Sequence, residues 1–175
     1  MNIKCIVTGV LDENCYVLTK DNKALIIDPG DDYPKIKEAL GDNKLLGVLI
    51  THSHFDHIGA LRNFLTKRSI KIFKKSSVEE KEYEIGNFKF ECLYTPGHSK
   101  DSISFYFREE ETMFVGDFIF KGSTGRTDLP SGDSNDMKES IKKILTYDEN
   151  TKLYPGHGEP TTLKDEKENI TLQIK

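Results

Sequence analysis

The chain has 175 residues and a net charge of −4, and 36% of its residues are hydrophobic and 31% charged, a balance typical of a soluble globular domain. The 25 basic residues are scattered among 29 acidic ones, so nucleic acid is an unfavourable partner on electrostatic grounds. No apolar run approaches the ~20 residues that span a bilayer, and the N-terminus lacks a signal-peptide core. We expect one domain over residues 1–175, in the cytoplasm and without membrane association.

The first half of the chain is predicted to combine strands with short helices. Alternating or short apolar runs indicate strands at 2–10, 14–19, 24–27 and 45–50. Helical patterns are present at 34–40 and at about 58–67. The third strand ends abruptly at Asp28, because Pro29 cannot continue a hydrogen-bonded ladder.

The second half is predicted to contain further strands and two longer helices. The strands are at 70–73, 88–94, 103–107, 112–115 and 152–154, and the helices at about 135–146 and 163–172. Residues 74–84 are charged and weakly patterned, and residues 118–134 are rich in glycine, so both are predicted loops. Asp133 or Ser134 is expected to cap the first helix, and Thr162 the second.

The order of these elements predicts the fold class. The strands fall into two sets, at 2–50 and 70–115, and the helices are interspersed among them. This order favours an α/β (α+β) protein in which two sheets pack together with helices outside, an αββα sandwich. Periodicity alone leaves a single mixed sheet open.

Three of the five histidines lie in one short stretch, Thr51-His52-Ser53-His54-Phe55-Asp56-His57. The stretch follows an apolar strand and precedes a helix, so it lies at a strand end, where α/β folds bind their ligands. Imidazole and carboxylate groups are ligands that suit zinc, iron and manganese. The stretch therefore predicts a metal site.

The other two histidines have a shared setting. His98 and His157 each follow a Pro-Gly pair that comes after a predicted strand, and Asp28 and Asp117 also lie just after strands. If these strand ends converge, five imidazoles and several carboxylates meet, and packed carboxylates repel one another. A bound divalent metal ion would offset that repulsion, so we expect one site built from several strand ends.

Together these motifs resemble those of the metallo-β-lactamase superfamily in residue type, order and spacing. They are the HxHxDH signature at 52–57, Pro-Gly-His at 96–98, Gly-Asp at 116–117 and Pro-Gly-His-Gly at 155–158. The stretch Gly-Arg-Thr-Asp-Leu-Pro at 125–130 is most similar to the small glyoxalase II-like (hydroxyacylglutathione hydrolase-like) hydrolases. The resemblance covers nearly the whole chain and implies the αββα metallo-β-lactamase fold, with two mixed β-sheets and helices on the outer faces.

The resemblance also implies two divalent metal ions, with zinc as the first choice and iron or manganese as alternatives. His52, His54 and His98 would hold the first ion, Asp56, His57 and His157 the second, and Asp117 would bridge both. Asp56 and Asp117 are then the catalytic residues, acting with a hydroxide that bridges the ions. Asp28 would orient the histidine loop by hydrogen bonding.

Arg126 is the candidate for substrate binding, because a guanidinium near the metals can hold a substrate carboxylate through two hydrogen bonds. A surface ion pair with Asp128 is the alternative. The implied substrate is a small molecule with a thioester or other ester-like carbonyl. We expect no separate C-terminal glutathione-binding region of the kind that full-length glyoxalase II enzymes carry, so recognition of glutathione stays open.

Two other functions stay open. A persulfide dioxygenase shares the fold and a Gly-Arg-Thr-Asp stretch but uses one iron, which here would be held by His52 or His54 with His98 and Asp117. A non-catalytic metal-binding module of the same fold is the other alternative. Lactamase activity is disfavoured, because true β-lactamases of this fold commonly use a cysteine on the second metal, and Asp117 has that place here.

Overall fold

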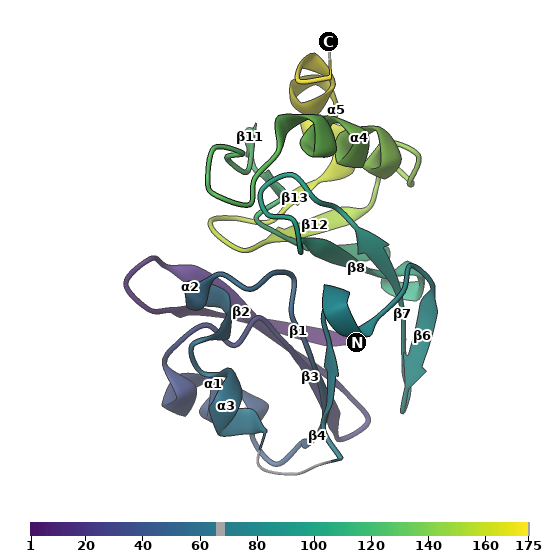
Figure 1. Ribbon diagram of the computed structural model, residues 1–175. Coiled ribbons are helices and arrows are strands. Elements are labelled where there is room, and N and C mark those ends of the chain that lie inside the picture. The colour runs from purple at the N-terminus through teal and green to yellow at the C-terminus, as the bar shows by residue number, and fades with distance from the viewer. Residues whose placement is uncertain (66–68, 175) are drawn as a thin grey trace.

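The computed structural model describes residues 1–65 and 69–174. Two β-sheets pack face to face, and helices cover the outer face of each (Figure 1). Both sheets contain parallel as well as antiparallel strand pairs. The predicted αββα sandwich with two mixed sheets is therefore confirmed, and the alternative of a single sheet is wrong.

The first sheet is formed by the N-terminal strands in sequence order. It contains β1 (Asn2–Thr8), β2 (Glu13–Lys20), β3 (Lys23–Ile27), β4 (Lys44–Leu49) and β5 (Lys71–Phe73). The pairs β1–β2 and β2–β3 are antiparallel, and β3–β4 and β4–β5 are parallel. Because β3 and β4 are parallel, their carboxyl ends lie at the same edge of the sheet.

The second sheet has the order β13-β12-β9-β8-β7-β6. Its strands are β6 (Glu82–Ile85), β7 (Phe88–Tyr94), β8 (Ile103–Phe107), β9 (Thr112–Gly116), β12 (Lys152–Pro155) and β13 (Thr161–Thr162). The pair β9–β12 is parallel and the other pairs are antiparallel. A separate small hairpin joins β10 (Ile119–Phe120) to β11 (Ser123–Thr124).

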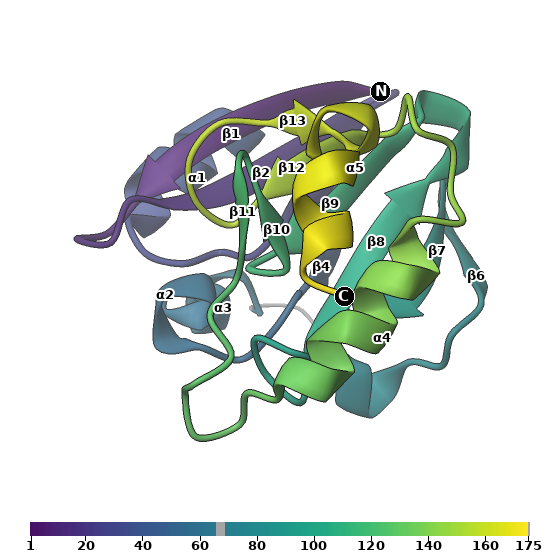
Figure 2. The same cartoon turned by 90° about the horizontal axis from the view of Figure 1, so that it is seen from above.

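The helices form the two outer layers of the sandwich. They are α1 (Tyr33–Leu40), α2 (Phe55–Ile58), α3 (Leu61–Phe64), α4 (Ser134–Ile144) and α5 (Leu163–Leu172), with 3₁₀ turns at Lys75–Ser77 and Arg108–Glu110. The first three cover the first sheet, and α4 and α5 lie over the second (Figure 2). No helix among the described residues is long and apolar enough to cross a membrane.

The strand pattern fills the core from both faces of each sheet. In β2, Tyr16 and Leu18 face the second sheet, whereas Cys15 and Val17 pack under the helices of the first, because successive side chains point to opposite faces. The space between the sheets is largely aromatic. It contains Phe88, Phe90, Phe105, Phe107 and Phe114, all at most 1% exposed.

The predicted helix at 58–67 is wrong in its extent. The structure has two short helices, α2 and α3, separated at Gly59 and Ala60. The Ala60 amide donates to the carbonyls of Pro29 (3.0 Å) and Gly30 (2.8 Å) instead of continuing the helix. A tertiary contact with the turn after β3 therefore interrupts the helical pattern, and residues 66–67 lie outside the described residues.

The strand assignments also differ from the prediction: the predicted loop at 118–134 contains the β10–β11 hairpin, and two edge strands differ as well. The predicted loop at 74–84 contains most of β6, which pairs with β7 as an edge strand. The strand at 70–73, grouped by sequence with the second set, is β5 and extends the first sheet beside β4. Both are edge strands. The short, charged sequence of β6 concealed the strand itself, whereas β5 was located as a strand and only its sheet was assigned wrongly.

Hydrogen bonds between the loops hold the two sheets together at one edge. The Ile103 amide donates to the Thr51 carbonyl at 2.8 Å, and the Asn14 amide to the Gly156 carbonyl at 2.7 Å. The hydroxyl of Tyr16 donates to the Pro155 carbonyl at 2.6 Å. The loops that follow strands of both sheets therefore meet at this edge.

Candidate metal centre

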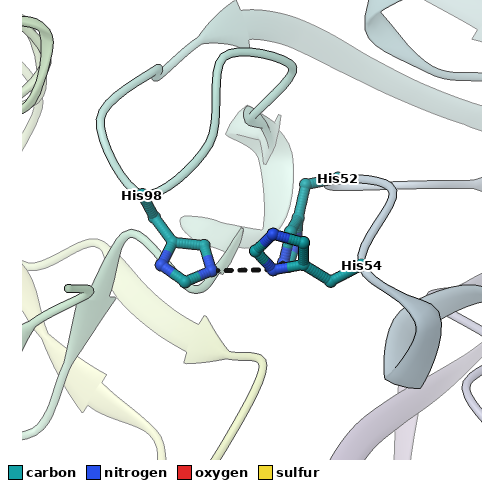
Figure 3. A group of neighbouring side chains, drawn as sticks. All are labelled: His52, His54 and His98. Carbon is teal, nitrogen blue, oxygen red and sulfur yellow. Dashed lines mark hydrogen bonds between the residues drawn. The ribbon is translucent and has the colours of Figure 1, made fainter. Parts of the chain in front are cut away.

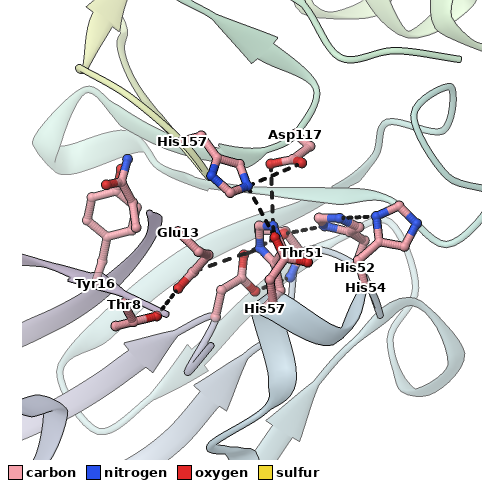
Figure 4. Close-up of polar contacts among 12 residues, drawn as sticks. Thr8, Glu13, Tyr16, Thr51, His52, His54, His57, Asp117 and His157 are labelled. Carbon is pink, nitrogen blue, oxygen red and sulfur yellow. Dashed lines mark hydrogen bonds and ion pairs between the residues drawn. The ribbon is translucent and has the colours of Figure 1, made fainter. Parts of the chain in front are cut away.

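The structure brings all seven predicted ligand residues together at the joined edge of the two sheets. Three loops carry them from the second sheet, after β7, β9 and β12, and one from the first sheet, after β4. Figure 4 shows the groups from the two sheets facing each other. Their positions form three overlapping groups in which all potential ligand atoms lie within 4.8 Å of one another: His52, His54 and His98; Asp56, His57 and His157; and His52, His57 and Asp117.

The first group consists of three imidazoles. The Nδ1 atom of His54 lies 3.0 Å from Nε2 of His52 and 3.0 Å from Nε2 of His98. His98 reaches the group from the loop after β7, opposite the other two (Figure 3). The three rings thus point ring nitrogens at one shared point.

The second group lies beside the first and contains a carboxylate. The Oδ2 atom of Asp56 lies 3.3 Å from Nε2 of His157 and 3.7 Å from Nε2 of His57. His57 is fully buried, and His157 is partly exposed. An imidazole pair with one carboxylate is a ligand set suited to zinc or iron.

Asp117 lies between the two groups. Its Oδ1 atom is 3.4 Å from Nε2 of His57, and its Oδ2 atom is 3.5 Å from Nε2 of His98 and 3.7 Å from Nε2 of His157. One carboxylate therefore reaches rings of both groups. Burial alone would raise the pKa of Asp117, but the neighbouring His57 ring outweighs burial and holds that pKa well below its usual range.

Backbone carbonyls determine which nitrogen of two histidines carries the proton. Nδ1 of His98 lies 2.9 Å from the Arg126 carbonyl, and Nδ1 of His157 lies 3.0 Å from the Leu11 carbonyl. A carbonyl only accepts hydrogen bonds, so each Nδ1 must donate. In the neutral ring, the Nε2 lone pair then faces the site in both cases.

Asp28 determines which ring nitrogen carries the proton in His52 and His57, two of the histidines that follow β4. One of its oxygens accepts from the Thr51 amide at 2.7 Å, and the other from the Thr51 hydroxyl at 2.5 Å and from Nδ1 of His57 at 3.0 Å. Since the Thr51 hydroxyl has one proton and donates it to Asp28, it accepts from Nδ1 of His52, 3.1 Å away. Asp28 therefore orients one ring of each group.

When the rings are neutral, as metal binding requires, these hydrogen bonds leave several lone pairs without donors. Nε2 of His57 and Oδ1 of Asp117 are buried and have no hydrogen-bond partner. In the first group, one proton at most, on Nδ1 of His54, is available to two Nε2 lone pairs, each 3.0 Å away. Burial together with the His57 ring lowers the pKa of His52 to about 2, so the His52 ring supplies no further proton. Convergent lone pairs and a carboxylate without donors fit bound cations.

Two glycines make room for the converging groups. A Cβ atom on Gly156 would collide with the Asp117 carboxylate and the His57 ring. Gly116 has a φ of +52°, and a Cβ there would collide with the side chain of Thr51. The Gly-Asp motif at 116–117 and the Pro-Gly-His-Gly motif at 155–158 thus contain glycine because the backbone passes directly against the site and the residues that hold it.

Arg126 has a different position from the other predicted site residues. Its guanidinium makes a bidentate ion pair with Asp128, at 2.6 and 2.8 Å, and both side chains are exposed. Its backbone carbonyl, by contrast, binds His98. The ion pair is the alternative that the sequence left open, and binding of a substrate carboxylate by Arg126 stays a prediction.

Sequence reasoning missed Glu13 and Thr51. Glu13 is fully buried beside His57, with Oε1 3.8 Å from Nδ1 of that ring and without a hydrogen-bond partner. Its other oxygen accepts from the Thr8 hydroxyl at 2.8 Å. Burial and the Asp28 carboxylate raise the pKa of Glu13 to about 9. A glutamate next to a predicted turn gives no sign of burial, whereas Thr51 had a signal in its place directly before His52.

Replacing Glu13 by glutamine is expected to flatten the pH dependence of stability. Because the pKa of Glu13 in the folded protein is above its unfolded value, its contribution is fully present below pH 4.5 and is lost as the pH rises towards 9. Between pH 5 and 8, the Glu13 carboxyl should lower the unfolding free energy of the metal-free wild type by about 2–4 kcal/mol, and this loss should be absent from the variant. Urea titrations in the presence of a chelator measure the unfolding free energy at each pH. The control is Glu38→Gln, the same change at an exposed glutamate of α1. Equal pH slopes in wild type and variant would contradict the buried neutral carboxyl.

The chain belongs to the metallo-β-lactamase superfamily. The profile of that superfamily matches residues 8–81 and 76–157, which span the whole site. This result agrees with the αββα fold and with the resemblance of the motifs. The family therefore places this protein among the metallo-hydrolases.

The proteins similar to this chain have names that state different activities or metals. The hydroxyacylglutathione hydrolase GloC of Haemophilus influenzae is 31% identical over 95% of each chain. The crystal structure of the B3 metallo-β-lactamase BLEG-1 covers 99% of this chain and 100% of its own, with a TM-score of 0.86 and 34% identity. That of TTHA1623 in a di-iron-bound form covers 95% and 98%, with a TM-score of 0.84 and 30% identity.

Proposed function

We propose that this protein is a dinuclear metal-dependent hydrolase that cleaves a thioester or another ester-like carbonyl of a small molecule. His52, His54 and His98 would hold one ion and Asp56, His57 and His157 the other, with Asp117 shared between them. Zinc suits both sets of ligands, and iron suits them too, in line with the di-iron form of a similar structure. When bound, two such ions activate a water and polarise the carbonyl.

One observation carries the proposal: the carboxylate of Asp117 lies between two complete groups of three ligand residues. It is within 3.7 Å of a ring nitrogen in each group. A site for one iron would use two histidines of the first group and Asp117, and would leave Asp56, His57 and His157 without a role. A non-catalytic module likewise gives no reason for a shared carboxylate.

The residues around the ligands contribute orientation. Asp28, with Thr51, and the carbonyls of Leu11 and Arg126 hold Nδ1 of four rings, so that their Nε2 lone pairs remain available. Partners of this kind are typically worth about 10–100-fold in metal affinity or activity. The Haemophilus relative matches this chain over 95% of its length, which supports a glyoxalase II-like thioester hydrolase of this size.

A substrate panel with defined metal content tests the proposal. Protein loaded with zinc, iron or manganese is assayed on S-lactoylglutathione, simple thioesters, lactones, a β-lactam and glutathione persulfide, and bound metal is counted by elemental analysis. We expect two ions per chain and hydrolysis of at least one thioester. One iron per chain with oxygen consumption on the persulfide would replace the hydrolase by a dioxygenase, and no turnover with two ions bound would favour a non-catalytic module.

Acid is expected to release the second ion before the first. Histidine binds metal only as the neutral ring, so protons compete with the ion. Burial lowers the pKa of His57, but the Asp117 and Asp28 carboxylates outweigh burial and raise it well above its ordinary value, whereas the pKa of His52 is about 2. Competition is therefore present at His57 near neutral pH, and the affinity for its ion should fall by about tenfold per pH unit as the pH drops.

A chelator competition series from pH 8 to pH 5 measures this difference, and turnover should fall below pH ~6. A flat affinity and activity profile down to pH 5 would contradict the role of His57 as a ligand.

A further inference from the structure

A small recess lies beside the second ligand group, between the loop that joins β1 to β2 and the helix α2. Its volume is about 150 Å³. The residues that line it are Gly9, Val10, Leu11, Gly30, Asp31, Phe55, Asp56 and Gly59. The side chains of Val10 and Phe55 are 94% and 72% exposed, and Leu11 is 49% exposed. Large apolar side chains gathered in this way on a surface mark a binding site.

The recess borders the second ligand group through two of the residues that line it. Asp56 lines the recess, and its Oδ2 atom is 3.3 Å from Nε2 of His157. Leu11 also lines it, and its carbonyl accepts from Nδ1 of the same histidine. The recess therefore lies next to the second ligand group, on the side of Asp56 and Leu11.

The charge of the recess disfavours an anionic ligand. Asp31 and Asp56 contribute acidic side chains to its lining, and none of the described residues that line it is basic. A ligand carboxylate in this space would lie close to both without a cation to pair with. Arg126, the predicted residue for carboxylate binding, does not line the recess and has its guanidinium paired with Asp128.

We propose that this recess binds an uncharged apolar acyl group of the substrate, an inference that rests on the proposed hydrolase function. The acyl group stays attached to the reacting carbon throughout hydrolysis, whereas the thiol leaves, so a fixed recess beside the centre suits the acyl side. A volume of about 150 Å³ is enough for a benzene-sized group. The substrate class is thus thioesters of short to medium uncharged acyl chains.

A chain-length series tests the recess. Thioesters of one thiol, N-acetylcysteamine, with acetyl, butanoyl and hexanoyl groups are compared with a succinyl thioester. We expect kcat/KM to rise by about fourfold per added methylene, and the succinyl ester to be cleaved more slowly than the butanoyl ester. Values of kcat/KM that do not change with the length of the acyl chain would overturn the inference.

Two matched variants locate the effect. Val10→Ser changes the recess, and Val7→Ser makes the same change at a half-exposed valine of β1 that does not line it. Val10→Ser should lower the ratio of hexanoyl to acetyl kcat/KM by about three- to tenfold, and Val7→Ser should leave it unchanged. Equal effects of both variants, or a change in self-association of Val10→Ser with unchanged selectivity, would overturn the recess as a substrate site.

A binding measurement separates this inference from the proposed function. The ketone analogue of the hexanoyl ester, in which a methylene replaces the sulfur, is titrated calorimetrically into metal-loaded protein. Binding that Val10→Ser weakens and Val7→Ser does not supports the recess even if no thioester is turned over, which would refute the hydrolase alone. Turnover of thioesters with no difference between the two variants in analogue binding would refute the recess alone.

Discussion

Replacing Asp117 by alanine is expected to remove both metal ions and to abolish turnover. Its carboxylate reaches ring nitrogens of both ligand groups, at 3.4 to 3.7 Å. Without it, each ion loses a negative ligand, and the buried Nε2 of His57 loses its neighbour. We expect turnover to fall at least about 10³-fold, since several kcal/mol of charge stabilisation are lost. Elemental analysis and steady-state kinetics measure the two effects.

The control for Asp117→Ala is Asp42→Ala. It makes the same change at an exposed aspartate in the turn before β4, at the end of that strand remote from the site. This variant should keep both ions and full turnover. A fully loaded and active Asp117→Ala protein would refute the shared carboxylate, and with it the dinuclear proposal.

Replacing His54 by alanine is expected to remove one ion and leave the other. His54 belongs to the first group only, where its Nδ1 lies 3.0 Å from the ring nitrogens of both partners. The second group keeps Asp56, His57 and His157 and still includes Asp117. Turnover should fall at least about 10³-fold, while elemental analysis finds close to one ion per chain.

The number of ions that His54→Ala retains, compared with Asp117→Ala, shows whether the two ligand groups bind their ions independently. If His54→Ala loses both ions to the same extent, the two groups do not bind independently. If it keeps both, His54 is not a ligand. A thermal melt in chelator shows whether the metal-free variant remains folded, so that a loss of metal is not confused with a loss of structure.

The sequence was most informative where a feature depends on neighbouring residues. Asp133 accepts from the amides of Asn135 and Asp136 and so caps α4 as predicted, and Thr162 caps α5. Strands with apolar residues on both faces, such as those at 14–19 and 103–107, were located correctly. Such patterns indicate burial directly, because each apolar position in the strand must be kept out of water.

The sequence was least informative where a distant contact decides the outcome. The helix after the histidine stretch breaks because the Ala60 amide bonds to the turn after β3, about thirty residues away in sequence. The edge strand β6 alternates charged and apolar residues over only four positions, a pattern too short to stand out within a charged segment, and its pairing with β7 establishes the strand. Glu13 has an ionisable side chain and is nevertheless fully buried, which its sequence neighbours do not indicate.

The histidine and aspartate motifs determined the family, the fold class and the candidate ligands, because ligand type and strand-end position are both local properties. Only the tertiary structure decided how the ligands divide. It brings a ring from the second sheet to the two of the first group, places Asp117 between both groups, and makes Asp28 and two carbonyls present the Nε2 lone pairs. These arrangements depend on loops of different sheets meeting at one edge, a relation that no single stretch of the chain contains.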